Sequence, residues 1–440
     1  MKRRLRDIVI VLPGITGSVL QHDGRDVWAI SRGGVWNALT SLGRSFDHLV
    51  LEDDDPDVDD LGDGVTAPRL MGDVHLVPGL VKIDGYGRIM QMLEDEFEMV
   101  PGQAGSDQPA NLYPFPYDWR RDNRVAARKL QQLVESALPR WREHTGAQDA
   151  QVILLAHSMG GLVARHYLEV LGGHEHCRAL ITFGTPYRGS LNAVDFLANG
   201  FKKLLLDLTH LLRSFTSVYQ LLPIYPAVEV GGAWTRVAEA DLPGVDRQRA
   251  TAALEFHRAI ESAVEDRRSA GGDYTLLPFL GTRQPTKQSA VVDDGMVRVG
   301  RELPTGIDPL LGDGDGTVPR LSAIPIELSE EYRDTFITER HSSLQNHGGV
   351  LGDIRERLVQ MQIEGLAAIR GPTTAPQRER AAAIALDLDD LYLPTEPVRV
   401  EVTRIGTELP VQVAVAPVEG GAPTFVEVEG EDVELPGLPP

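Results

Sequence analysis

A serine in a glycine-rich turn is the first residue of this sequence that points to chemistry. Ser158 lies in the segment LAHSMGG, after an apolar run and before a helical stretch, with the small residues Ala156 and Gly160 two positions on either side. This spacing predicts a tight strand-to-helix turn that exposes the serine hydroxyl at a helix N-terminus. The Met159 amide would then point to the place where an oxyanion forms. The alternative is a glycine-rich turn with an incidental serine.

A nucleophilic serine needs a base and an orienting acid, which in hydrolases of this design follow it in the order Ser, Asp or Glu, His. The preferred acid is Asp315 in the segment GDGDGTVP, and Asp313 is the second choice. The preferred base is His341, because Leu344 can anchor its loop and the last predicted helix follows. His347 is the second choice. The alternatives are a Gly-Asp turn or a calcium-like loop for the acid, and ordinary surface residues for the histidines.

The loop after the first predicted strand could supply a second oxyanion donor. In PGITGS, Gly14 lets the backbone turn, and the amide of Ile15, with Thr16 beside it, would face Ser158. A phosphate-binding loop is the rival interpretation. It is disfavoured because the lysine that should follow the glycines is missing, as is the three-glycine dinucleotide pattern.

Two other clusters could suggest a metal. His174, His176 and Cys177 form one short group with no second ligand pair, which favours a helix-to-strand loop. Glu52–Asp60 (EDDDPDVDD) carries seven acids in nine positions but lacks the spacing and glycine turn of a calcium loop. We interpret it as a solvated loop, with an acidic metal cage as the alternative. The sequence predicts no metal and no organic cofactor.

The elements that would position these residues alternate between strands and helices. Apolar runs predict buried strands over Asp7–Leu12, Gln151–Ala156, Ala179–Phe183 and Tyr274–Leu280. Helical spacing predicts helices over 86–99, 123–144, 159–171 and 350–369. This order indicates an α/β fold with a mostly parallel sheet and helices on both of its faces.

Two segments depart from that alternation. From Gly189 to about Gly272 the strand pattern disappears and helix-like stretches such as Phe196–Leu212 follow, which predicts a helical cap over about 190–272. We interpret its stripe of leucines as cap core rather than lipid contact; the stripe is Leu204, Leu205, Leu208, Leu211 and Leu212. After Gly371 alternation dominates, so we predict a hydrolase domain over 1–370 and an acidic, β-rich appendage over 371–440.

Composition excludes several classes of function. Lys and Arg total 43 against 64 Asp and Glu, and the net charge of −21 would repel nucleic acid. No apolar run reaches the length of about 18 residues that a spanning helix needs, and no signal peptide is indicated. The single cysteine, Cys177, cannot form an internal disulfide, which fits a cytoplasmic location.

Five segments together resemble a known family. They are LPGITGS at 12–18, FPYDWRRD at 115–122, AHSMGG at 156–161, FGTPYRGS at 183–190 and GDGTVP at 314–319. With them the chain resembles a bacterial member of the lecithin:cholesterol acyltransferase family, the α/β-hydrolases that include lysosomal phospholipase A2. The resemblance implies that Ser158 is the nucleophile, Asp315 the acid and His341 the base, with Ile15 and Met159 as oxyanion donors. The cysteines of the disulfide-closed loop in secreted members are missing, and residues after Gly371 lie outside the resemblance.

The predicted function is a serine-dependent lipid ester hydrolase or O-acyltransferase that forms an acyl-serine and passes the acyl group to water or an alcohol. The cap would shield the acyl chain and contact a membrane transiently. One alternative is a non-catalytic interaction protein whose appendage over 371–440 recruits a protein partner. Another is an esterase or amidase that acts on a non-lipid substrate.

Overall fold

A computed structural model gives the fold of the 440-residue chain. It describes residues 2–29, 48–72, 85–203, 206–271, 274–328, 336–337, 339–363, 383–388, 398–405, 410–415, 424–428 and 432–435. The predicted helix beyond 363, Leu204 and Leu205 therefore lie outside the described residues.

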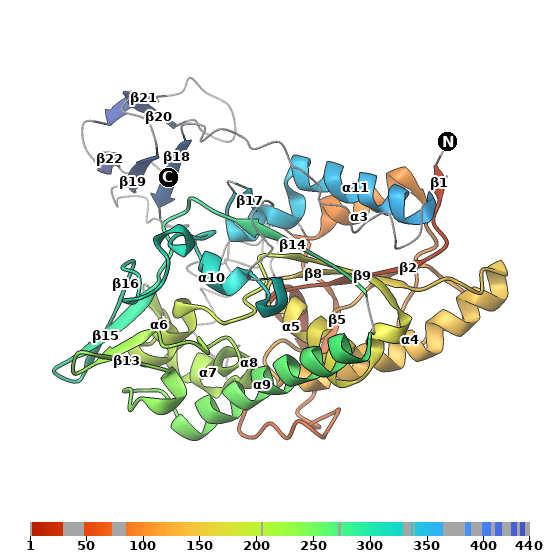
Figure 1. The fold of residues 1–440 in the computed structure, drawn as a ribbon, viewed down its shortest axis with the longest axis horizontal. Coiled ribbons are helices and arrows are strands. Elements are labelled where there is room, and N and C mark those ends of the chain that lie inside the picture. The colour runs from red at the N-terminus through yellow and green to blue at the C-terminus, as the bar shows by residue number, and fades with distance from the viewer. Residues whose placement is uncertain are drawn as a thin grey trace.

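A six-stranded sheet forms the centre of the described structure, and its paired strands all run parallel (Figure 1). In spatial order the strands are β17 (Phe336–Ile337), β14 (Thr275–Gly281), β9 (Cys177–Phe183), β8 (Val152–His157), β2 (Ile8–Leu12) and β7 (Leu112–Pro114). Every residue of β2, β8 and β9 is buried. These strands are continuous apolar runs in the sequence because both faces of the sheet are covered. The predicted parallel sheet is confirmed.

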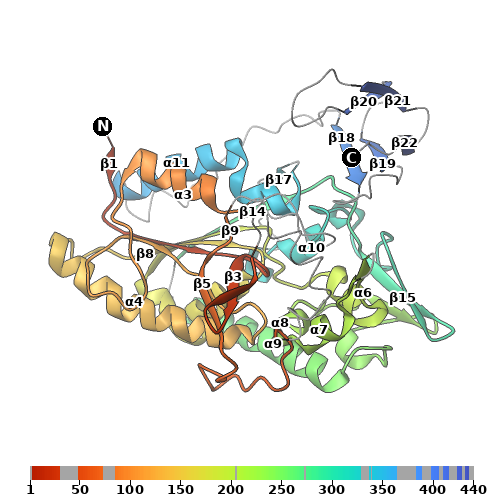
Figure 2. The same cartoon turned by 180° about the vertical axis from the view of Figure 1, so that it is seen from behind.

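Helices cover both faces of this sheet in two opposed views (Figures 1 and 2). One face carries α3 (Gly87–Glu96) and α11 (Gly348–Ile363), and the other carries α4 (Asn123–Thr145), α5 (Gly160–Arg165) and α9 (Arg247–Ala270). Successive side chains of a strand point to opposite faces. In β2, Val9 and Val11 accordingly pack with α3 and α11, whereas Ile8 and Ile10 pack with α4.

Local signals explain where the long helix α4 begins and ends. The Asp122 carboxylate accepts a hydrogen bond from the Arg124 amide at 2.8 Å, which caps the first turn. Gly146 ends the helix in a left-handed conformation with φ +73°. The segment predicted as one helix over 159–171 contains α5 followed directly by a π-helical turn at His166–Val170.

The segment predicted as a helical cap is not purely helical, which corrects that prediction. Its helices are α6 (Leu191–Asn199), α7 (Thr209–Ser214), α8 (Thr216–Tyr219) and α9. It also contains two strands of a four-stranded sheet, which is formed in spatial order by β13 (Ala233–Thr235), β12 (Val228–Val230), β15 (Ser289–Asp293) and β16 (Met296–Gly300). Three residues are too few for β12 or β13 to display a strand period.

The helix-like stretch Phe196–Leu212 is also interrupted. Gly200 ends α6 with φ +78°, and a Cβ there would press on Thr209. A short antiparallel pair follows, formed by β10 (Lys202–Lys203) and β11 (Leu206–Asp207), before α7 begins. The prediction failed because the apolar spacing continues across a glycine whose backbone conformation a helix cannot contain.

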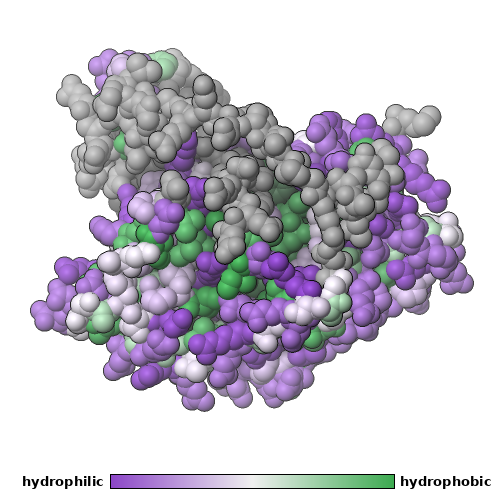
Figure 3. Space-filling view, in the orientation of Figure 1, coloured by the Kyte–Doolittle hydropathy of each residue, from purple (hydrophilic) through white to green (hydrophobic). Residues whose placement is uncertain are grey.

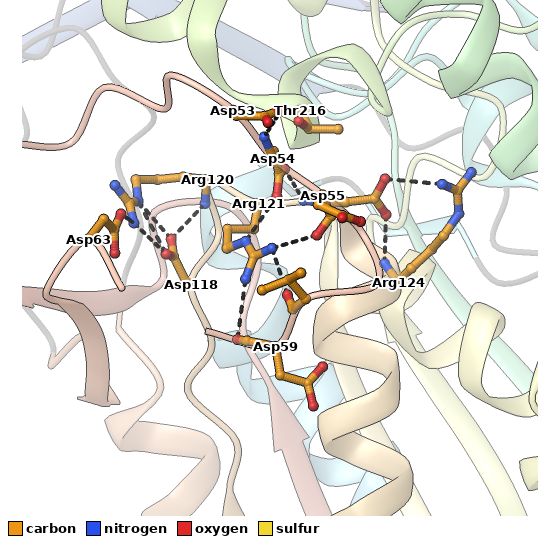
Figure 4. Close-up of polar contacts among 12 residues, drawn as sticks. Asp53, Asp54, Asp55, Asp59, Asp63, Asp118, Arg120, Arg121, Arg124 and Thr216 are labelled. Carbon is orange, nitrogen blue, oxygen red and sulfur yellow. Dashed lines mark hydrogen bonds and ion pairs between the residues drawn. The ribbon is translucent and has the colours of Figure 1, made fainter. Parts of the chain in front are cut away.

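The acidic segment Glu52–Asp60 is a loop with most of its residues exposed, as predicted, but it also encloses one arginine side chain. The Arg121 guanidinium lies inside the loop, where its Nε donates to Asp54 Oδ1 at 2.9 Å (Figure 4). Both side chains of this ion pair are buried. The other guanidinium nitrogens donate to the loop carbonyls of Asp55, Val58 and Asp59. An arginine thus occupies the position that the metal-cage alternative assigned to an ion, and no metal-binding group of three His, Cys, Asp or Glu occurs among the described residues.

The described residues after 382 form strands, apart from Pro410. They are β18 (Ala383–Leu388), β19 (Val398–Ile405), β20 (Val411–Val415), β21 (Thr424–Val428) and β22 (Asp432–Leu435). These strands lie apart from the central sheet in both views (Figures 1 and 2). They have the β structure that the alternating sequence predicts, while a domain boundary at residue 371 stays a prediction.

Two further observations concern the surface. Hydrophobic residues gather around α10 (Arg320–Ala323) on the face that Figure 3 presents, whereas the margin along α9 and α4 is mostly hydrophilic. Within the described chain, none of the helices combines the length and the hydropathy that crossing a bilayer requires.

Candidate active site

Ser158 stands on the turn between β8 and α5 in a left-handed backbone conformation, with φ +51°. Such a conformation costs a residue other than glycine about 1–3 kcal/mol, so the surroundings must hold it. The Ser158 amide donates to Phe183 O at 2.8 Å, and the Ser158 carbonyl accepts from Thr185 Oγ1 at 3.0 Å. A Cβ on Gly160 would collide with the backbone of the loop after β2. The turn therefore has the sharpness that the spacing of small residues predicts.

His341 and Asp315 extend a hydrogen-bonded chain from the serine. His341 Nε2 lies 2.9 Å from Ser158 Oγ, and His341 Nδ1 lies 2.8 Å from Asp315 Oδ2. The other carboxylate oxygen, Oδ1, accepts from the amides of Thr317 and Val318 at 3.0 and 2.7 Å. Because the carboxylate can only accept, the His341 proton belongs on Nδ1, which leaves Nε2 free to accept from the serine hydroxyl.

Two glycines make room for this chain. Gly184, directly after β9, has φ +58°, and a Cβ on it would lie 2.7 Å from His341 Nδ1 and 2.9 Å from Asp315 Oδ2. A Cβ on Gly281, at the end of β14, would overlap the Asp315 side chain. Gly184 belongs to the segment FGTPYRGS, so the structure supplies a physical reason for a glycine at that position.

The second-choice residues lie outside this chain. His347 has its Nε2 3.9 Å from a carboxylate oxygen of Glu339, and its side chain is 37% exposed. Asp313 accepts from the Arg283 amide at 3.3 Å, and burial raises the pKa of its carboxyl. The structure brings Ser158, Asp315 and His341 into contact and leaves the two alternatives apart from them.

The loop after β2 passes directly over the serine. A Cβ on Gly14 would lie 2.8 Å from Ser158 Cβ, and Thr16 adopts a left-handed conformation with φ +62°. The amides of Ile15 and Met159 donate to no other atom of the described residues. Two unpaired amides beside a serine hydroxyl have the chemistry of an oxyanion-binding site.

The segment FPYDWRRD fixes this loop from the opposite side. Tyr117 Oη donates to Pro13 O at 2.8 Å, and Trp119 Nε1 donates to Ser18 O at 3.0 Å. Both aromatic side chains are buried. Their hydrogen bonds set the path of the chain on both sides of Ile15.

An apolar cavity begins at Ser158 and His341. Its walls come from the loop after β2, from Trp28 and Trp119, and from the segment between β9 and α9. The apolar residues that this last segment contributes include Phe196, Leu208, Leu211, Leu212, Phe215 and Val218. Trp119 packs edge-on against Trp28 and Phe215, with ring centroids 5.1 and 5.6 Å apart. A hydrocarbon chain covalently attached at the serine could occupy such a cavity without exposing its surface to water.

Two predictions about exposure need correction. Ser158 is only 6% exposed, because its hydroxyl faces this cavity instead of open solvent. Leu208, Leu211 and Leu212 belong to the core cluster but also line the cavity, so the stripe is not core alone. Both corrections have the same cause, because the segment between β9 and α9 lines the cavity above the turn that carries Ser158.

Sequence reasoning missed two buried residues beside the site. The Tyr86 hydroxyl lies 2.8 Å from the Gly14 amide and 3.0 Å from His157 Nδ1. His157 Nε2 lies 3.1 Å from His341 O. The sequence offers a signal for His157, because this residue directly precedes the serine in LAHSMGG. No local pattern around Tyr86 indicates its role.

The parallel sheet, the helices on both of its faces and the serine on the turn after β8 define an α/β-hydrolase fold. Residues 82–254 match the model of the lecithin:cholesterol acyltransferase family, which confirms the resemblance over that part of the chain. The segments LPGITGS and GDGTVP lie outside the matched residues. A comparison with curated proteins gives no match.

Two solved structures are similar to the chain. The crystal structure of the Tle4–Tli4 complex shares 16% sequence identity, with 82% of this chain and 99% of that chain covered and a TM-score of 0.51. Lipase BlEst2 of Bacillus licheniformis, in its mature form, shares 12% identity, with 82% of this chain and 94% of that chain covered and a TM-score of 0.36. The first of these similarities concerns the fold.

Proposed function

We propose that this protein is a serine-dependent lipid ester hydrolase or O-acyltransferase that works through an acyl-serine intermediate. The observation that carries the proposal is the hydrogen-bonded chain of Ser158, His341 and Asp315 at the start of an apolar cavity. The match of residues 82–254 to an acyltransferase family supports the same class of reaction.

The proposed reaction has two matched halves. Ser158 Oγ attacks the ester carbonyl while its proton passes to His341 Nε2, and the Ile15 and Met159 amides donate to the oxyanion that forms. His341 then gives this proton to the alcohol of the ester, which departs. The acyl group stays attached to Ser158 as an acyl-serine. Water or another alcohol attacks that ester, with His341 again taking and returning a proton. Asp315 stabilises the positively charged His341 in each half.

The cavity supports a lipid-like substrate. A fatty acyl chain attached to Ser158 would lie along apolar walls that include Trp119 and Leu212. Each buried methylene would contribute about 0.8 kcal/mol, so binding should strengthen with chain length until the cavity is filled. The proposed chemistry requires no metal and no organic cofactor.

The first test is the variant Ser158→Ala, assayed with p-nitrophenyl esters of increasing acyl length. We expect turnover to fall at least about a thousandfold and the fluorophosphonate label to be lost, because the nucleophile is gone. Ser136→Ala is the matched control, since that hydroxyl donates to Leu133 O within α4. Wild-type turnover by Ser158→Ala would refute the proposal.

The acyl series separates the proposal from its rivals. Rising kcat/KM with chain length is expected for a lipid ester, whereas a flat or short-chain preference would favour the esterase or amidase alternative. A Ser158 that neither turns over esters nor takes the label would favour the interaction protein with a recruiting appendage. Product analysis with a long-chain alcohol present measures transfer against hydrolysis.

A further inference from the structure

Tyr86 and His157 connect two loops of the candidate active site through an unbroken hydrogen-bonded chain. The Gly14 amide can only donate, so it donates to Tyr86 Oη, whose own proton is directed to His157 Nδ1. The His341 carbonyl can only accept, so His157 carries its proton on Nε2 and donates it there. The chain has one consistent set of donors, and it fixes one tautomer of His157.

The surroundings keep His157 neutral. It is 2% exposed, and burial is the main reason why its pKa falls to about 3. The His341 ring lies 5.1 Å away between centroids and also lowers the His157 pKa. The other titratable groups near His157 are Tyr86 and Tyr117, and burial raises the pKa of both. Tyr117 donates a hydrogen bond to the carbonyl of Pro13, the residue before Gly14. A neutral His157 does not oppose the positive charge that His341 acquires when it takes the serine proton.

A second contact joins the same two regions. Asn346, in the 3-10 turn that begins at His341, donates through Nδ2 to Gly85 O at 2.7 Å. Residues 85 and 86 therefore contact the His341 turn through one hydrogen bond and the Gly14 loop through another. Ser158, which follows His157 directly, lies close to both regions, because its Oγ is 2.9 Å from His341 Nε2 and a Cβ on Gly14 would be 2.8 Å from its own Cβ.

We propose that Tyr86 and His157 are positioning residues, which hold the Gly14–Ile15 loop and His341 at the correct distance from Ser158. This inference rests on the proposed function. The alignment matters because displacing reacting groups by about 1 Å can cost on the order of a hundredfold in rate. Tyr86 does not line the cavity that would hold the acyl chain, so its loss should lower kcat and leave KM nearly unchanged.

The main test is the variant Tyr86→Phe, which removes one hydroxyl and leaves the ring in place. We expect kcat for a p-nitrophenyl ester to fall about 10- to 100-fold, with KM within about threefold of the wild-type value. The control is Tyr167→Phe, which removes a buried hydroxyl that has no hydrogen-bond partner among the described residues. We expect its kcat to stay within about twofold of wild type.

A double-mutant cycle tests the connection itself. His157→Gln retains a side-chain donor, and combining it with Tyr86→Phe should cost little more than the worse single change, because both break one chain. Multiplying losses would overturn the proposal, as would a wild-type kcat for Tyr86→Phe. If wild type lacked ester turnover and fluorophosphonate labelling, the proposed function itself would fail. Active wild type with an unaffected Tyr86→Phe variant would refute only the positioning role.

A measurement on the wild-type protein avoids any folding defect of the variants. Nitrogen-15 NMR of labelled histidines should report His157 as the neutral tautomer protonated on Nε2 from about pH 8 down to about pH 5. A His157 that is protonated on Nδ1 or positively charged in this range would contradict the chain of donors. Changes in the His341 Nδ1 proton resonance in folded Tyr86→Phe would further support the positioning role, and an unchanged resonance would argue against it.

Discussion

At the scale of single residues, the candidate site is held together by backbone groups as much as by side chains. The left-handed Ser158 is fixed by hydrogen bonds of its own amide and carbonyl, to Phe183 and Thr185. The Asp315 carboxylate is oriented by the amides of Thr317 and Val318. These contacts define the geometry before any substrate binds, which is the condition for efficient proton transfer and oxyanion binding.

The choice of base is a prediction at this scale. We expect His341→Ala to lower the turnover number by several orders of magnitude, because Ser158 would lose the acceptor for its proton. His347→Ala should stay within about threefold of wild type, because its imidazole contacts Glu339 rather than the serine. Steady-state kinetics on one ester decides the matter, and comparable losses in both variants would contradict the assignment.

Local sequence was informative for Ser158, Asp315 and His341, because each lies in a segment whose neighbours indicate the role proposed for it, and the three side chains are in hydrogen-bond contact. The contact between Tyr86 and His157 could not be predicted in this way. It joins residues 71 positions apart, and a tyrosine directly before a helix carries no local signal of a distant partner. Ser158 was predicted to be exposed, since no local pattern reveals that a distant segment covers it.

At the scale of elements, the loop that contains Glu52–Asp60 is attached to the body of the protein by neighbouring arginines. Arg121 lies inside the loop, and Arg120 donates to Asp63, Asp118 and the Leu49 carbonyl. The next residue along, Asp122, caps the first turn of α4. Attachment of the loop and the start of the long helix therefore depend on the same few residues, near the Trp119 that lines the cavity.

We predict that Arg121→Ala lowers the free energy of unfolding by about 3–5 kcal/mol, because Asp54 would remain buried without its partner. Arg128→Ala is the matched control, since its ion pair with Asp59 is partly exposed and should contribute at most about 1 kcal/mol. Denaturant titration measures both. Equal, small losses would show that the buried pair does not stabilise the loop.

The strands and helices of the central layers were predictable because their periods extend over whole elements. The structure of the cap was only partly predictable. Apolar spacing suggested a continuous helix across Gly200, and a helix pattern does not show where a single glycine will end it. The prediction of a helical cap also missed β12, which pairs with the distant β15. A local signal for β12 did exist, because it forms a hairpin with β13 through Gly231 and Gly232, both with positive φ.

At the scale of the whole molecule, three buried histidines connect separate layers. His157 lies in the candidate site, His166 stacks on Phe256 of α9, and His257 donates to Gln220 O at 2.7 Å. Burial is the main cause that lowers their pKa values, to about 3 for His157 and about 4 for His166 and His257. The folded protein therefore keeps all three neutral at pH values where the unfolded chain is protonated.

This difference predicts how stability depends on pH. Between about pH 6.5 and pH 4 the unfolded state binds more protons, so the free energy of unfolding falls as the solution is acidified. Each histidine contributes a slope of about 1.4 kcal/mol per pH unit over most of this range. Denaturant titrations at several pH values measure the slope. His257→Gln, which retains a donor for Gln220, should reduce it by one histidine's share, and an unchanged slope would contradict the prediction.

The enclosed position of Ser158 has a consequence for the fate of an acylated enzyme. An ester formed there would be sheltered by Trp119 and the leucines of α7, so few water molecules would reach it at any moment. The lifetime of the ester would then depend on access of the acceptor rather than on its bulk concentration. An amphiphilic alcohol that partitions into the apolar cavity would compete with water according to its concentration inside the cavity.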